Sequence, residues 1–271
     1  MFAPKDQDNR QAGARGLTRH HLGALARGLR RAAAGAVCAA AVTLPFAGAA
    51  AQSATTTPAF TPLTLVHGWA NYKNGTASAA VASVNGIVHL KGGIKTAGTN
   101  PVPFTLPAGD RPAHEVYVPV DVCNGDNGRL DITPSGVVTV EAEEGVWANA
   151  KCLTSLDGVS FARSASSFTP LTLENGWTST GLASAPPAVR VISGVVHLEG
   201  DMYSNGINPV PFTLPAAFRP AHNVAVKVAL CGNDSGTLII GPGGEATVQA
   251  EGGNWSDAQC QTSVDGVWFA R

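Results

Sequence analysis

Four of the five cysteines in this sequence could carry covalent chemistry, because they form two pairs with the same spacing. Cys123 and Cys152 are 29 residues apart, and Cys231 and Cys260 repeat that spacing. Four cysteines allow three pairings, and since one pair is a copy of the other, we predict the disulfides Cys123–Cys152 and Cys231–Cys260. A zinc site of four cysteines is the alternative, but the sequence lacks the close C-x-x-C pairs of such sites.

Histidines and carboxylates that could take part in acid–base or metal chemistry also occur twice, 108 residues apart: His89/His197, His114/His222, Asp126/Asp234, Glu143/Glu251 and Asp157/Asp265. Catalysis would need such groups to converge, but the sequence contains no G-x-S-x-G, H-E-x-x-H or phosphate-binding glycine motif. We expect His89 and His114 to face solvent or to cap a turn. Asp126 and Asp157 stand in Asp/Gly turns, where a carboxylate often binds its own backbone.

Aromatic side chains could contact a ligand, because exposed Trp and Tyr present a flat apolar face with a polar edge. Trp69 and Trp147 recur as Trp177 and Trp255, so these four either pack in the core or form one binding platform used twice. The remaining candidates have no aromatic counterpart in the other copy, and the fold manages without them. We therefore expect them to be exposed and name them as candidate ligand contacts: Tyr72, Tyr117, Tyr203 and Trp268.

These residues belong to two copies of one longer sequence. The phrase NPVPFTLPAGDRPAH at 100–114 returns as NPVPFTLPAAFRPAH at 208–222, and the offset of 108 holds from Phe60 to Arg271 without insertion or deletion. A period this long exceeds that of solenoid repeats and matches one domain. We predict two domains, 60–163 and 168–271, joined by a short flexible linker at 164–167.

Alternating apolar residues predict that each copy consists of strands. In the first copy the pattern covers Val116–Val118–Val120–Val122, Leu130–Ile132, Val138–Val140–Ala142 and Val88–Leu90, and the second copy keeps each apolar face. Turn signals such as Asn85-Gly86 separate these runs, and no segment shows a helical period. The sequence therefore predicts an all-β fold of two tandem antiparallel β-sandwich domains, jelly-roll-like, with one disulfide each. Pro101 and Pro103 confine the strand VPFTLP to a sheet edge or a bulge.

Several of these segments resemble a known kind of module. GIVHLKG at 86–92, PFTLPAGDRP at 103–112, GRLDITPSGVVTV at 128–140 and LDGVSF at 156–161 are similar to the β-sandwich modules at the tips of phage tail fibres and minor tail proteins. Modules with a cysteine pair also occur in exported actinobacterial proteins of unassigned role. The resemblance implies a rigid sandwich that recognises a surface, often a cell-envelope glycan.

The first 51 residues have the order of a secretory signal: a basic stretch, an apolar stretch and small residues. We predict that residues 1–51 are a signal peptide cleaved after Ala51, and that 52–59 are a spacer. Removing the signal leaves 11 basic against 17 acidic residues, a net charge of −6. This charge argues against nucleic acid and against an anionic membrane as partners, so we expect a secreted protein that is free of the membrane after cleavage.

We therefore predict an exported, non-enzymatic binding protein without metal or cofactor. Its partner would be a repetitive cell-surface or extracellular glycan, and two weak sites on one chain would give avidity. One alternative is a structural coat or matrix protein that associates with itself. The weaker alternative is a glycan-active enzyme using Asp126 or Asp157, since a glycosidase needs two carboxyls at a set distance across one bond.

Overall fold

The computed structural model describes residues 58–271, with the exception of residue 182. The predicted signal peptide at 1–51, its cleavage after Ala51 and the spacer residues 52–57 lie outside the described residues. Below, residues 60–163 are called repeat 1 and residues 168–271 are called repeat 2.

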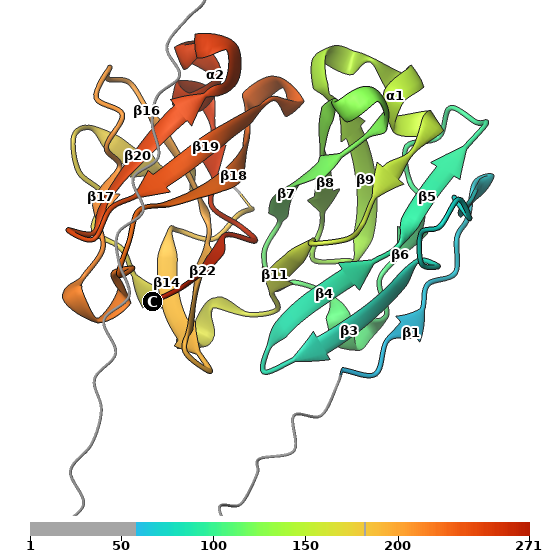
Figure 1. Cartoon of the computed structure of the whole chain (residues 1–271), viewed down its shortest axis with the longest axis horizontal. Helices are drawn as coiled ribbons and strands as arrows, with labels where there is room; N and C mark the ends of the chain where they lie inside the picture. Colours follow the sequence, from blue (N-terminus) through green and yellow to red (C-terminus); the bar gives the residue numbers. More distant parts are fainter. Residues whose placement is uncertain (1–57, 182) are drawn as a thin grey trace, which may run out of the picture. The chain divides into compact units, whose positions relative to one another are not determined.

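Repeat 1 consists of short antiparallel strands in two layers (Figure 1). The first layer is a sheet in the order β1 (Thr61–Pro62), β3 (Ala80–Val84), β4 (Ile87–Lys91), β11 (Ser160–Ala162). The second layer has two parts, β2 (Trp69–Asn71)–β5 (Gly93–Thr96)–β10 (Thr154–Ser155) and β7 (Val116–Asp121)–β8 (Asn127–Ile132)–β9 (Val137–Ala142)–β6 (Phe104–Thr105). An antiparallel bridge between Val122 and Thr154 joins these two parts.

Repeat 2 has the same order of strands. Its first sheet is β12 (Thr169–Pro170), β14 (Ala188–Ile192), β15 (Val195–Glu199), β22 (Trp268–Ala270). Its second sheet is continuous: β13 (Trp177–Ser179), β16 (Asp201–Ser204), β21 (Thr262–Ser263), β18 (Val224–Leu230), β19 (Ser235–Ile240), β20 (Glu245–Ala250), β17 (Phe212–Thr213). The prediction of an all-β fold with two tandem antiparallel sandwiches is confirmed.

Each repeat encloses its own apolar core between its two layers. In repeat 1 the core joins Val88 and Phe161 of the first layer to Leu130 and Val140 of the second. In repeat 2 an equivalent cluster runs from Trp177 to Phe269. The alternating apolar residues of the strands point into these cores, as period-two patterning requires.

The duplicated phrase forms a corner between strands. β6 and β17 lie at the end of their sheets, as Pro101 and Pro103 predicted for repeat 1. The backbone carbonyl of Asn100 accepts a hydrogen bond from Trp69 Nε1 at 2.9 Å, and the Arg111 Nε donates to the carbonyl of Leu106 at 3.0 Å. Asn208 and Arg219 make the same two contacts in repeat 2. The phrase therefore occurs twice because each sandwich uses it to form this corner.

The paired tryptophans are packing residues rather than a platform. Trp69 is 5% exposed, and its ring meets that of Trp147 edge to face with 6.0 Å between centroids. Trp177 and Trp255 repeat this geometry at 6.0 Å. Such pairs contribute about 1 kcal/mol beyond the burial of their surface, so all four stabilise the fold.

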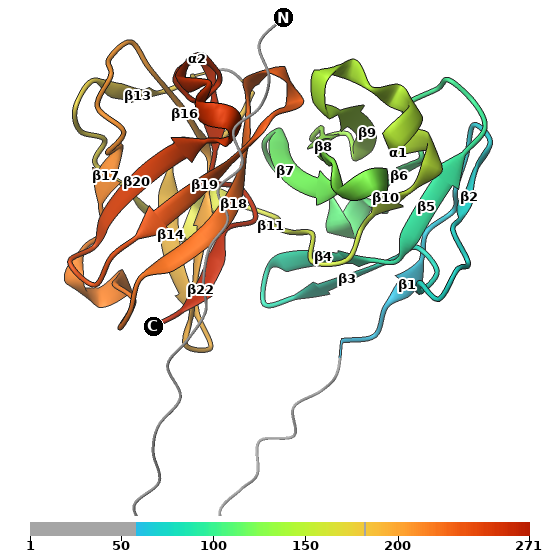
Figure 2. The same cartoon turned by 45° about the horizontal axis from the view of Figure 1, so that its top comes forward.

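Two short helices were missed by the sequence analysis. α1 (Trp147–Cys152) and α2 (Trp255–Cys260) span six residues each, too few to show a helical period. α1 lies beside β9 and β10 (Figure 2), and its last residue carries the Cys123–Cys152 disulfide. The second disulfide, Cys231–Cys260, holds α2 in the same way, so the predicted pairing is confirmed.

The linker is an ordered turn. Residues 165–167 form one turn of 3-10 helix, and Ser164 caps it by accepting a hydrogen bond from the backbone nitrogen of Ser166. We had expected a flexible joint, but the side-chain hydrogen bonds of serine stabilise a compact turn here.

Replacing Cys231 and Cys260 by serine should lower the free energy of unfolding by about 3 kcal/mol, because the cross-link restricts the unfolded chain. Urea unfolding of the double variant against the wild type measures this loss. Reduction of the wild type with dithiothreitol is the control and should lower the urea midpoint further, since it opens both disulfides. An unchanged midpoint in the double variant would contradict a stabilising role for this bond.

Candidate functional site

The two repeats belong to one compact unit and meet through equivalent strands. β7 of repeat 1 lies against β18 of repeat 2. Lys227 Nζ lies 2.8 Å from the Asp121 carboxylate and donates to Asn127 Oδ1 at 2.8 Å. Asn127 in turn donates to Glu251 Oε2 at 2.8 Å. These polar contacts fix how repeat 1 and repeat 2 are docked.

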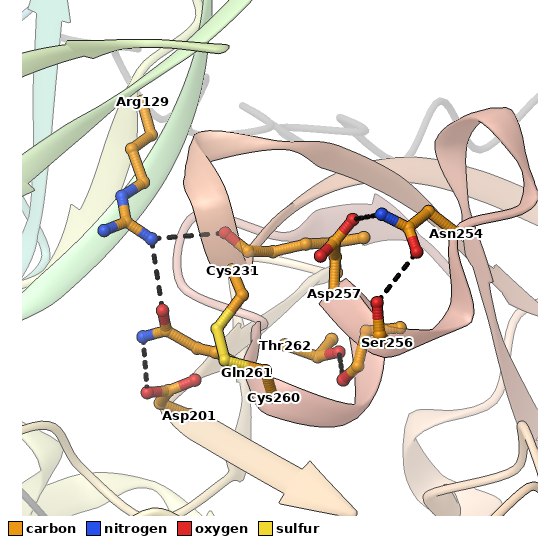
Figure 3. The surroundings of a disulfide bond; sticks show 11 residues. Arg129, Asp201, Cys231, Asn254, Ser256, Asp257, Cys260, Gln261 and Thr262 are labelled. Atoms are coloured by element: carbon orange, nitrogen blue, oxygen red, sulfur yellow. Dashed lines mark hydrogen bonds between the residues drawn. A yellow bond between two sulfur atoms is a disulfide. The ribbon is translucent and has the colours of Figure 1, made fainter. Parts of the chain in front are cut away.

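Arg129 on β8 links repeat 1 to the disulfide region of repeat 2. Its guanidinium donates to Glu141 within repeat 1 at 2.8 Å, and to the carbonyl of Leu230 and to Gln261 Oε1 at 3.2 Å and 3.1 Å. Figure 3 shows Arg129 pointing toward Gln261 beside the Cys231–Cys260 disulfide, and Gln261 continuing to Asp201. The planar guanidinium presents several N–H donors in a fixed geometry, so one side chain can bind acceptors in both repeats.

Asp157 and Asp265 occupy equivalent positions in the two repeats but make different contacts. Asp157 Oδ1 accepts the Gly92 amide at 2.9 Å, and Asp265 Oδ1 accepts the Gly200 amide at 2.8 Å. Only Asp265 also accepts an amide of the other repeat, from Tyr117 at 3.3 Å, and it is 2% exposed. Asp265 is therefore a contact between the repeats.

Burial gives several carboxyls near Asp265 raised pKa values. Burial raises the pKa of Asp265 to about 7 and that of Asp201 to about 6. Burial and the Asp265 charge raise the pKa of Glu199 to about 8. Burial, followed by the neighbouring Glu115, raises the pKa of Asp131 to about 7. At neutral pH this cluster therefore keeps part of its protons, which relieves the repulsion between neighbouring carboxyls.

A cavity of about 430 Å³ lies between the first layers of the two repeats. Five pairs of equivalent positions line it: Val84/Ile192, Asn85/Ser193, Ile87/Val195, His89/His197 and Ser160/Trp268. Equivalent surfaces of the two repeats therefore face each other across the cavity, as around an approximate two-fold axis. Phe60 and Pro58 add apolar wall, so the lining combines apolar and aromatic surface with a few polar groups, as in ligand sites.

Hairpin geometry positions the lining residues. The β3–β4 hairpin turns at Asn85-Gly86, whose φ angles of 52° and 85° match a two-residue turn with positive φ at both positions. Alternation then places Val88 in the core, whereas Ile87 and His89 point away from it toward the cavity. His89 lies opposite Ser160, and His197 lies opposite Trp268 on the neighbouring strand.

Trp268 breaks the symmetry of the cavity. It is 52% exposed and occupies the position that Ser160 holds in repeat 1. It also lines a second cavity of about 240 Å³, together with Val118, Lys227 and other residues of both repeats. Because Trp268 lies on one side of the cavity and the small Ser160 on the other, the face of the Trp268 ring stays accessible.

The two histidines face this cavity rather than open solvent, which corrects our expectation for His89. Burial lowers the pKa of His89, and burial together with the charges of His89 and Arg190 lowers the pKa of His197. The sequence carried one signal for this pairing, a histidine kept at the same position in both copies. It could not show that the two copies of this histidine meet.

The other predicted contact residues do not join Trp268. The tyrosines are half-buried rather than exposed, because each packs against a polar or charged neighbour, and none of the three lines the cavity. Tyr72 lies near Lys95, and Tyr117 stacks with Arg129 at 4.8 Å in the docking interface. Tyr203 lies beside α2.

The candidate catalytic carboxylates have structural partners. Asp126 accepts a hydrogen bond from Asn149 of α1, and Asp157 binds the Gly92 amide rather than its own turn. In repeat 2, Asp257 replaces Asn149, and burial and Asp257 raise the pKa of Asp234 to about 7. These contacts tie turns to strands and helices.

Among residues 58–181 and 183–271, no three His, Cys, Asp or Glu side chains cluster in a way that could hold a metal ion. The same described stretch has no helix with the length and apolar character needed to span a bilayer.

Comparison with protein-family models, with curated proteins and with solved structures found no match to this chain. Functional inference therefore depends on the residues and geometry of the chain itself.

Glu199→Gln should raise the free energy of unfolding at about pH 8 by about 2 kcal/mol and change it little at about pH 4. The folded state binds more protons than the unfolded chain between the ordinary pKa of glutamate and the raised pKa of Glu199, about 8. Wild-type stability therefore falls as pH rises through this window, and glutamine removes Glu199's share of the fall.

Urea unfolding at both pH values measures this difference, with Glu245→Gln as the matched control because Glu245 is exposed. Parallel pH profiles for the wild type and Glu199→Gln would show that Glu199 titrates alike in both states, contrary to this expectation.

Proposed function

We propose that this chain is an exported, non-enzymatic binding protein that recognises a repetitive surface carbohydrate. The observation that carries this proposal is Trp268, an aromatic side chain 52% exposed at the cavity between the repeats. A sugar presents an apolar ring face and a rim of hydroxyls. The cavity offers an aromatic wall together with the polar groups of Asn85, Ser160 and Ser193, which supports such a ligand.

The position of the cavity changes the expected mode of binding. Trp69 and Trp177 are buried, and Trp147 and Trp255 are partly buried and pack edge to face against them, so the four rings do not provide one open platform in each repeat. The cavity draws on both repeats and occurs at their junction. We therefore propose that the two sandwiches bind one sugar segment together, and that avidity arises between chains on a repetitive polymer.

Export is also part of the proposal. Two disulfides in a chain of this size fit an oxidising compartment, and the signal peptide predicted from residues 1–51 would deliver the chain there. The negative charge of the remaining chain argues against nucleic acid and anionic membranes as partners.

Trp268→Ser should reduce carbohydrate binding at least about tenfold, because it installs the residue of repeat 1 and removes the stacking face. A glycan array selects the ligand, and isothermal titration calorimetry measures the affinity of each variant. Tyr203→Lys is the matched control: it also installs the repeat 1 residue, Lys95, but lies outside the cavity, so it should bind as the wild type does.

Absence of binding to every glycan by folded, oxidised protein would contradict the carbohydrate proposal. Sedimentation velocity on the same sample then tests the structural alternative, which requires assembly that grows with protein concentration. Equal affinity of Trp268→Ser and wild type would move the binding site away from this cavity.

A further inference from the structure

The cavity has a charge character that narrows the class of sugar. None of the described side chains that line it is a carboxylate, although residues 52–271 carry 11 basic against 17 acidic residues, a net charge of −6. The titratable groups among its described lining residues are His89 and His197, which come from equivalent positions, and the charge of His89 helps to lower the pKa of His197. An acidic protein that leaves one cavity free of acid groups provides the complement of an anionic ligand.

Two further cations, Lys91 and Arg190, lie near lining residues of the cavity without lining it themselves. Lys91 follows His89 on the same face of β4 and lies 4.2 Å from the ring centroid of Phe60, a lining residue. Arg190 lies opposite His197 across the β14–β15 pair and is half-buried. Lys91, on the same strand as His89, and Arg190, on the strand paired with that of His197, therefore add positive charge near the two histidines.

One carboxyl lies on the same face of β15 as His197 and affects the charge near the cavity. Glu199 follows His197 by two residues on β15 and is 4% exposed. Burial and the charge of Asp265 raise the pKa of Glu199 to about 8, so it is mostly protonated below that pH. On the strands opposite the histidines, Ala82, Ser160 and Trp268 carry no charge.

The geometry points to an acidic sugar as the ligand, with its carboxylate between His89 and His197 and its ring against Trp268. This inference rests on the proposed carbohydrate site and adds the ligand class and a pH dependence. Two imidazoles that share one carboxylate each supply an N–H donor when protonated, and charge-assisted hydrogen bonds of this kind are the stronger ones.

The sign of the pH dependence follows from the free protein. Burial lowers the pKa of both histidines, so the empty cavity holds neutral imidazoles at neutral pH. A bound carboxylate stabilises the protonated imidazoles, so binding takes up protons. Affinity for the acid should therefore rise as pH falls from about 7.5 to about 5.5.

The test compares each acid with a neutral partner of the same ring. Tetragalacturonate and 3′-sialyllactose are each paired with their own methyl ester, so the two pairs distinguish the carboxylate of a uronic acid from that of a sialic acid. Calorimetry on the chain from residue 52 onward should show at least a tenfold preference for one of the acids at about pH 5.5. The preference should shrink at least tenfold by about pH 7.5.

The double variant His89→Gln/His197→Gln should lose both the acid preference and the pH dependence. His114→Gln/His222→Gln is the matched control, since these histidines also occur in both repeats but do not line the cavity. Circular dichroism and the urea midpoint verify that each variant is folded.

Two outcomes would overturn the inference while leaving the carbohydrate site intact. In one, neutral and acidic partners bind equally, and Trp268→Ser weakens both. In the other, the acid preference survives in the His89→Gln/His197→Gln variant. Failure of every glycan to bind the wild type would remove the proposed function itself, and the inference with it.

Discussion

The buried carboxyl of Asp265 joins the two repeats, together with the polar contacts of Lys227 and Arg129. In repeat 1, Asp157 joins the β10–β11 turn to the Gly92 amide and stops there. In repeat 2, Asp265 makes the same contact with Gly200 and then accepts the amide of Tyr117 from repeat 1. Removing it would leave the amides of Gly200 and Tyr117 without this acceptor at a buried position, and an unsatisfied buried donor costs more than a hydrogen bond contributes. The same residue type therefore closes a turn in repeat 1 and also joins the repeats in repeat 2.

The hydrogen bonds at this junction are not symmetric, but the cavity beside it is lined by pairs of equivalent positions. When a surface meets its own copy, every residue near the axis faces its counterpart, and hydrophobic and polar groups occur in pairs. The lining of the cavity shows this pairing. The differences between counterparts then matter more than the similarities: Trp268 against Ser160 gives the cavity an aromatic wall on one side only. Duplication has supplied the framework of the cavity, and a single change has supplied its accessible ring.

Much of the fold could be predicted from the sequence, because its cause is local. Alternating valines determine strands, Asn85-Gly86 determines a two-residue turn, and the prolines beside Phe104 exclude that strand from the middle of a sheet. The disulfide pairing followed from the equal spacing of the cysteines. Helices α1 and α2 escaped because one and a half turns carry no period, and they are held instead by the disulfide and by tryptophan packing.

The site could not be predicted in the same way, because it depends on contacts between the repeats. Nothing in the order of residues says that His89 meets His197, or that Tyr117 is covered by repeat 2. Of the four aromatic residues without an aromatic counterpart, only Trp268 lines the cavity. The tyrosines share that signal but are half-buried beside lysine, arginine or α2, since an aromatic ring without a counterpart can equally fill a gap in packing.

The measurement that tests the central claim most directly is the stoichiometry of binding. Calorimetric titration of the oxidised chain with a short oligosaccharide chosen from a glycan array counts the sites without cutting the repeats apart. A site shared between two docked repeats predicts one oligosaccharide for each chain. Two equal and independent sites for each chain, one in each sandwich, would contradict this account and restore a bivalent arrangement of separate domains.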